Sequence, residues 1–136
     1  MDLALLRSTF EMVAPQADAV AERFYDRMFR IYPQVKPLFV NTEPAHQRKK
    51  LMASIGAVVS LADKPDELGP VLDKLGRSHV DYRVEPHQYA YVSASLLATL
   101  AETFGDAWTP EASETWAEAL RVVSDAMIKA QARAVA

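Results

Sequence analysis

Eight prolines divide this chain of 136 residues into segments, and most of the segments repeat apolar residues every three or four positions. Proline interrupts the interior of an α-helix but is favoured in its first turn, so each proline predicts a helix boundary. The prolines stand at positions 15, 33, 37, 44, 65, 70, 86 and 110. Half of the residues are apolar, which at this length suffices for one core. We therefore predict a single all-α domain over residues 1–136, with about six to eight helices.

The periodicity places most of these helices along the chain. The long ones are expected over about residues 2–15, 15–31, 43–61, 87–104 and 110–130. A shorter helix is expected to begin near Pro70, after a polar connector over residues 62–70 with room for a single helical turn at 65–68. Residues 33–39 are too few and too rich in proline for a long helix, and they predict a tight helical turn that presents Phe39.

Capping residues predict several of the helix ends. Asp2, Thr42 and Thr109 are the predicted N-caps, because their side-chain oxygens can accept hydrogen bonds from the first turn. Gly105 is predicted to close the helix that precedes it, since glycine is favoured just after a helix. The last helix is expected to fray after Ala130.

Composition excludes several classes of function. The formal net charge is −3, and the basic residues are scattered apart from a short cluster at 48–50, so nucleic acid is not an expected partner. The chain has no cysteine, which excludes disulfides, thiolate metal sites and cysteine nucleophiles. The amino terminus lacks a signal-peptide pattern, and no apolar run approaches the roughly 20 residues of a membrane span. We expect a soluble cytoplasmic protein without a membrane partner.

One histidine stands on an apolar helix face. Leu72, Leu75 and His79 recur at i, i+3 and i+7, so their side chains project from one stripe toward the interior. An imidazole in that position is either a hydrogen-bonded core residue or a ligand for a metal. The stripe alone leaves both alternatives open.

Five short motifs, in order, carry a resemblance to a known family. They are Phe24-Tyr25, Pro37-Leu38-Phe39, Gln47-Arg48-Lys49-Lys50-Leu51, Gly76-Arg77-Ser78-His79 and His87-Gln88-Tyr89. With these motifs the chain resembles the globins, specifically the bacterial single-domain globins and the globin half of flavohaemoglobins. The resemblance covers essentially the whole chain. It implies a globin fold and a haem b cofactor (iron protoporphyrin IX).

The resemblance also implies which residues would hold the haem. His79 would be the axial ligand of the iron, with its other ring N–H donated to the backbone carbonyl of Leu75 and assisted or not by the Ser78 hydroxyl. Phe39 would pack on the haem face. The full set implied to contact the cofactor is His79, Phe39, Leu51, Leu75, Val84 and Tyr89.

On the ligand side of the haem, the resemblance implies Tyr25, Gln47 and Leu51. Gln47 and Leu51 lie four residues apart on one helix face, so they would enter the pocket together. The neighbouring register would place His46 inward with Lys50, an isolated charge in an apolar slot, and is therefore disfavoured. We expect His46 at the pocket mouth or in solvent.

Other polar residues have less defined expectations. His87 is expected at the surface. The cations that could reach the haem propionates, or that simply face solvent, are Arg48, Lys50, Arg77 and Arg83.

The chain departs from flavohaemoglobins at one position. In that family a proximal tyrosine, matched here by Tyr89, works with a glutamate of the last helix to draw on the histidine proton. An ungapped last helix puts Gln131 at the position of that glutamate. A neutral amide cannot draw the histidine toward imidazolate, so we expect a weaker peroxidase-like push from His79.

The expected function is reversible binding of dioxygen at ferrous iron, for storage, delivery or scavenging. Carbon monoxide and nitric oxide are further diatomic ligands that the resemblance implies. An alternative is nitric oxide dioxygenase, which would require a separate reductase. A third is a haem-based gas sensor or a haem-free globin module. Whether the protein is a monomer or a homodimer is left open.

Overall fold

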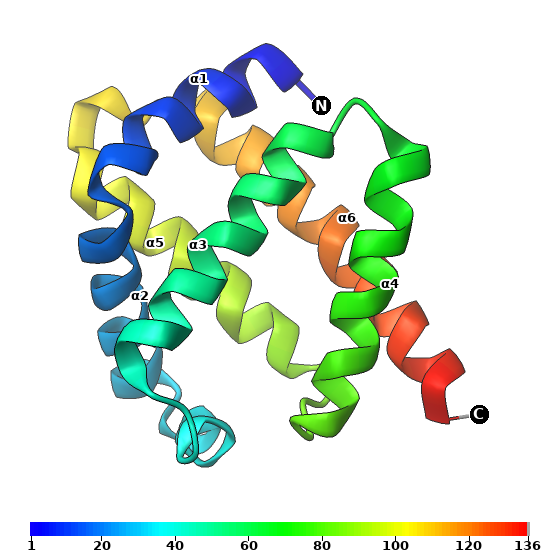
Figure 1. The fold of residues 1–136 in the computed structure, drawn as a ribbon. Helices are drawn as coiled ribbons and strands as arrows, with labels where there is room; N and C mark the ends of the chain where they lie inside the picture. Colours follow the sequence, from blue (N-terminus) through cyan, green and yellow to red (C-terminus); the bar gives the residue numbers. More distant parts are fainter. Residues whose placement is uncertain (136) are drawn as a thin grey trace.

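The computed structural model describes residues 1–135, and over this range the chain is built from helices without any strand (Figure 1). The all-α prediction is therefore confirmed. The α-helices are α1 (Leu3–Val13), α2 (Ala17–Ile31), α3 (Pro44–Leu61), α4 (Pro65–Asp81), α5 (Gln88–Phe104) and α6 (Pro110–Val135). Three 3-10 helices connect them, at Ala14–Gln16, Pro33–Phe39 and Gly105–Ala107.

Several predicted helix ends are present. The Asp2 carboxylate accepts a hydrogen bond from the Leu5 amide at 3.0 Å and caps α1. The Thr109 hydroxyl accepts one from the Ala112 amide at 3.1 Å and caps α6. Gly105 ends α5 with a φ of +53°, a conformation that glycine adopts without steric cost. These three ends depend on local chemistry, which the sequence displays directly.

The predicted cap of α3 is wrong by one residue. Glu43, not Thr42, is the N-cap, and its two carboxylate oxygens accept hydrogen bonds from the amides of Ala45 and His46 at 3.1 and 2.7 Å. The Thr42 hydroxyl instead donates to the Phe39 carbonyl at 2.8 Å, which closes the turn before the helix.

The helix that carries His79 begins earlier than predicted. It starts at Pro65 rather than near Pro70, and Pro70 lies inside it. A proline at this position removes the bond from its own nitrogen to the carbonyl of Asp66. Asp66 is exposed, so water can satisfy that carbonyl, and the helix continues through the proline. The predicted connector over residues 62–70 is therefore mostly helix.

The last helix also continues further than predicted. It remains helical to Val135 instead of fraying after Ala130, which is completely buried. Packing against α4 keeps this end in place. A Cβ atom added to Gly76 of α4 would lie 2.6 Å from the Met127 carbonyl oxygen and 2.8 Å from the Ala130 Cβ, so the two backbones are in close contact.

The core lies between α1, α2, α5 and α6. Its largest fully buried side chains are Leu6, Val13, Val20, Phe24, Met28 and Leu100. In Figure 1, α3 and α4 lie in front, and the long helix α6 runs behind them. Helix α3 buries little of its inner face, because Val59 is its only buried residue. Among residues 1–135, no helix is both long and apolar enough to serve as a membrane span.

Candidate functional site

His79 lies in the last turn of α4 with its side chain half-buried. Its Nδ1 is 2.6 Å from the backbone carbonyl oxygen of Leu75, which can only accept, so Nδ1 is the protonated nitrogen. The Ser78 hydroxyl does not take part, since it donates to the Lys74 carbonyl at 2.9 Å. Burial lowers the pKa of His79, which favours a neutral ring at neutral pH. The neutral ring then carries its lone pair on Nε2, the atom available to a metal.

Tyr89 packs against the His79 ring from α5. The two ring centroids are 5.9 Å apart with an interplanar angle of 27°. Burial raises the pKa of Tyr89 to about 12, so its hydroxyl keeps its proton. That hydroxyl donates to Oε1 of Gln131 on α6 at 3.0 Å, and Nε2 of Gln131 donates to the Val84 backbone carbonyl. The hydrogen-bonding partner of Tyr89 is thus the residue at the position that the ungapped last helix indicated.

Tyr25 and Gln47 form a second pair, which joins α2 to α3. The Gln47 amide nitrogen donates to the Tyr25 hydroxyl oxygen at 3.1 Å. Burial raises the pKa of Tyr25, although the Gln47 hydrogen bond partly opposes that shift. The phenol is therefore protonated at neutral pH, and its own proton is free to be donated elsewhere. Phe39 packs edge-on against Tyr25, with ring centroids 5.6 Å apart.

A cavity of about 250 Å³ opens beside this pair. Its lining comes from α2, from α3 and from the turn between them: Glu22, Tyr25, Asp26, Phe29, Phe39, Thr42, Pro44, Gln47 and Arg48. The two polar groups that the sequence placed on the ligand side and the phenylalanine expected on the haem face therefore line one space.

The residues present fit a flat apolar prosthetic group. Leu51, Leu75 and Val84 are apolar side chains that stay half-buried, and Met52 and Ile55 extend the half-buried face of α3. Such a face suits a haem, and a neutral imidazole with a free Nε2 is an iron ligand. The donor set and its surroundings therefore match what haem requires.

The other two histidines lie at the surface. His46 is exposed although it stands next to Gln47, so the register with Gln47 inward is the one the chain adopts. His87 is also exposed, and its Nδ1 lies 3.5 Å from a carboxylate oxygen of Glu85.

Among the four candidate cations, Lys50 contacts a neighbour of His79, the Tyr82 side chain. Its Nζ is 3.4 Å from the Tyr82 hydroxyl oxygen, and the Tyr82 ring centroid is 5.7 Å from that of His79. Arg48 is paired with Asp18 at 2.8 Å. Arg77 is paired with Asp73 at 3.0 Å, and Arg83 is exposed.

Two aromatic neighbours of the site, Phe29 and Tyr82, were not predicted from the sequence. Phe29 packs against both Tyr25 and Phe39, with ring centroids 5.8 and 5.3 Å away. Its position four residues after Tyr25 is a signal that could have found it. Tyr82 caps the end of α4 with helical backbone angles, and its position three residues after His79 is a comparable signal.

Comparisons with known proteins agree with this geometry. The globin family model matches residues 22–127. The chain is 32% identical over 131 residues to a flavohemoprotein of Bacillus subtilis, covering 93% of this chain and 32% of that protein. Flavohemoproteins of Rhodopirellula baltica and Rhizobium meliloti are 32% and 31% identical, covering 93% and 89% of this chain and 31% and 30% of those proteins. The chain thus spans about a third of the length of these relatives. By its helical fold and by the family match over most of its residues, the chain belongs to the globin family.

Proposed function

We propose that this globin binds haem b (iron protoporphyrin IX) through His79 and binds dioxygen reversibly, for storage, delivery or scavenging. Haem, when bound, supplies a ferrous iron that takes up diatomic gases. Phe39, Leu51, Leu75, Val84 and Tyr89 provide apolar contact to the disc and limit the access of water. The family match and the names of the flavohemoprotein relatives support this assignment.

His79 acts in its neutral form. The Leu75 carbonyl accepts a hydrogen bond from Nδ1 at 2.6 Å, which orients the ring and leaves Nε2 as the atom that would bind the iron. A backbone carbonyl and the neutral amide of Gln131 draw less on that proton than a carboxylate would. His79 is therefore the ligand of an oxygen carrier rather than of a peroxidase-type centre.

The hydrogen bond between Gln47 and Tyr25 is the observation that carries the proposal. Because Gln47 donates to the phenol oxygen at 3.1 Å, the phenol proton remains available to dioxygen. An O–H donor at this position would retain a ligand that carries partial negative charge, as dioxygen would on a ferrous haem. One such bond is worth about 1–2 kcal/mol, which slows release roughly tenfold.

Cycles of oxygenation test reversibility. The ferrous protein is exposed in turn to air and argon while its absorption spectrum is recorded. The expected result is the same pair of spectra over repeated cycles. Conversion to the ferric spectrum during the first exposure contradicts reversible binding.

A rival function, compatible with the similarity to flavohemoproteins, is nitric oxide dioxygenase, in which dioxygen reacts with nitric oxide to give nitrate. Sustained turnover by this route would need a reductase to return the iron to the ferrous state. Nitric oxide consumption is followed with a generic reductase present. A single burst equal to the protein concentration supports the carrier, whereas sustained turnover supports the dioxygenase.

A further inference from the structure

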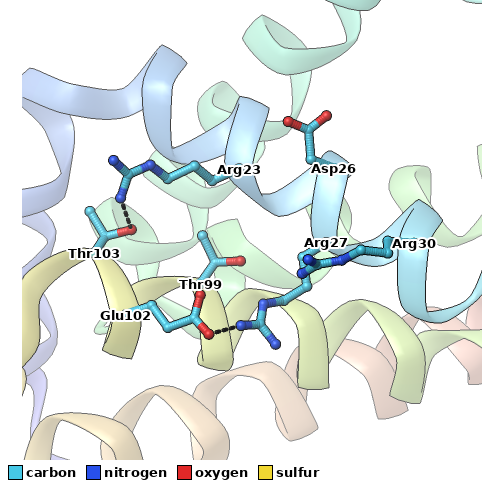
Figure 2. Close-up of a pocket in the computed structure, with 7 residues that line it drawn as sticks. All are labelled: Arg23, Asp26, Arg27, Arg30, Thr99, Glu102 and Thr103. Carbon is cyan, nitrogen blue, oxygen red and sulfur yellow. Dashed lines mark hydrogen bonds and ion pairs between the residues drawn. The ribbon is translucent and has the colours of Figure 1, made fainter.

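A second cavity, of about 360 Å³, lies between α2 and α5 (Figure 2). It shares no lining residue with the His79 side of the haem site, and the residue it shares with the Tyr25–Gln47 cavity is Asp26. We call it the arginine groove, and its lining residues are Arg23, Asp26, Arg27, Arg30, Thr99, Glu102 and Thr103. Neither the proposed function nor the family match assigns a role to it.

Three arginines of α2 gather on one wall of the arginine groove. Arg23, Arg27 and Arg30 follow one another at i, i+4 and i+7, which places them on one helix face. Like charges at this spacing repel and destabilise a helix. Arg30 benefits from its place in the last turn of α2, but Arg23 and Arg27 do not. The arrangement therefore calls for a negative partner.

Two carboxylates line the groove beside the three arginines, and one of them, Glu102, pairs with an arginine. Arg27 forms an ion pair with Glu102 of α5, while Arg23 donates only to the neutral hydroxyl of Thr103 at 3.4 Å. Within residues 1–135, no carboxylate lies within 4.0 Å of the Arg30 guanidinium. Figure 2 shows the Asp26 carboxylate directed away from α5, unlike the side chains of Arg23 and Arg27.

The groups facing the groove are mostly hydrogen-bond donors. Guanidinium N–H groups form paired hydrogen bonds that match the oxygens of carboxylates and phosphates. The Thr103 oxygen accepts from Arg23, so its own proton can be donated to a ligand. Thr99 is buried, and its hydroxyl already donates to the Ser95 carbonyl at 2.8 Å. Glu102 is the lining carboxylate that pairs with an arginine of this wall and so competes with an anionic ligand.

We propose that the arginine groove binds a small soluble compound carrying phosphate, a monoester or a diphosphate. The net charge of the chain is negative, yet three guanidinium groups gather at this groove. Such a cluster selects an anion of high charge density. The volume lies near the lower end of the roughly 300–1,000 Å³ found for small-molecule sites, which suits such a compound. This inference is independent of haem binding.

Calorimetric titration of the full chain with inorganic phosphate and with pyrophosphate tests the proposal, at ionic strength matched with sodium chloride. Saturable binding of both probes is expected, tighter for pyrophosphate. Arg30→Gln should weaken binding about tenfold, because it removes a charge-assisted fork. Arg121→Gln is the matched control, since Arg121 is exposed on α6 outside the groove, and it should leave affinity unchanged.

Glu102→Gln provides a second variant with an opposite expectation. Removing this carboxylate frees Arg27 and should tighten pyrophosphate binding severalfold, whereas damage to the fold would weaken it. Heats equal to those of chloride alone would overturn the proposal. Unchanged affinity in Arg30→Gln would also overturn it, as would binding to phosphatidic acid vesicles without any response to the two soluble probes.

Discussion

Two tyrosine–glutamine pairs belong to the site, and their hydrogen bonds run in opposite directions. Gln47 donates to Tyr25, whereas Tyr89 donates to Gln131. The Tyr25 proton is thus available to a ligand, and the Tyr89 proton is already engaged. The polarity of the second pair is determined by Val84, because its carbonyl can only accept and so binds the amide nitrogen of Gln131. The two sides of the site therefore differ in what they can donate.

Tyr25→Phe tests the ligand-side pair. The variant keeps the ring and its packing against Phe39 but loses the O–H donor, so dioxygen should dissociate about tenfold faster from the ferrous protein. Stopped-flow absorbance measures this rate. Tyr91→Phe is the matched control, since Tyr91 stacks on Tyr32 away from the pair. An unchanged dissociation rate in Tyr25→Phe would remove Tyr25 from ligand binding.

Gln131→Glu tests the second pair. A carboxylate still accepts from Tyr89 but no longer donates to Val84, so two acceptors face each other. The free energy of unfolding should fall by about 1 kcal/mol, measured by urea denaturation at neutral pH. Gln34→Glu, at an exposed position, should change it little. Equal stability of Gln131→Glu and the parent protein would contradict the assigned polarity.

At the scale of elements, the start of α3 has a pH-dependent cap. Hydrogen bonds from the amides of His46 and Ala45 hold the pKa of Glu43 below its ordinary 4.5. The folded pKa is the lower one, so this stabilisation is full above the ordinary pKa and is lost as pH falls through the folded value. Glu43→Ala should therefore lower Tm at about pH 7 and change Tm little at about pH 3.

Thr42→Ala is the control for this cap. Its hydroxyl donates to the Phe39 carbonyl and does not titrate, so any loss of Tm should be the same at both pH values. Thermal unfolding followed by circular dichroism gives both comparisons. A Glu43→Ala difference that persists unchanged in acid would show that the carboxylate does not cap α3.

The contact between α4 and α6 depends on Gly76. Gly76→Ala would place a Cβ 2.6 Å from the Met127 carbonyl oxygen, so the free energy of unfolding should fall by about 1–3 kcal/mol. Gly69→Ala in the same helix meets no atom within 4 Å and should stabilise by about 0.5–1 kcal/mol. Chemical denaturation measures both. Similar effects of the two substitutions would contradict the close approach of the helices.

The sequence predicted the elements better than their boundaries. Helical periodicity and helix caps depend on residues that lie close together in the sequence. The predicted caps at Asp2 and Gly105 are confirmed. The helix start predicted at Pro70 was wrong, because a proline can lie inside a helix when water hydrates the carbonyl that it leaves without a partner. The need for Gly76 was also invisible, since it arises from a helix distant in the sequence.

For the site, the resemblance indicated the residues and the hydrogen bond from His79 to the Leu75 carbonyl, but not the direction of the tyrosine–glutamine bonds. The spacing of Gln47 and Leu51 predicted that these two side chains point inward and His46 outward, and the structure has Gln47 and Leu51 half-buried and His46 exposed. The direction of each tyrosine–glutamine bond depends on partners such as the Val84 carbonyl, which only the folded chain brings into place. That His79 holds a haem stays a prediction.

At the scale of the whole molecule, the chain has two cavities, one beside the Tyr25–Gln47 pair and one between α2 and α5, and Asp26 lines both. Helix α2 contributes to both, with Tyr25 beside the first cavity and three arginines along the second. Charged side chains make up three of the nine residues that line the first cavity and five of the seven that line the second. Binding at the two is therefore expected to respond differently to salt, because screening weakens contacts between exposed charges most.

Titration of the purified protein with haemin, followed by reduction and addition of carbon monoxide, tests the central claim most directly. The absorption spectrum should show uptake of a single haem per chain and a strong band that shifts when carbon monoxide is added. His79→Ala should lose the spectrum of a histidine-ligated ferrous haem. A protein that neither carries haem from purification nor takes it up on addition would contradict the account.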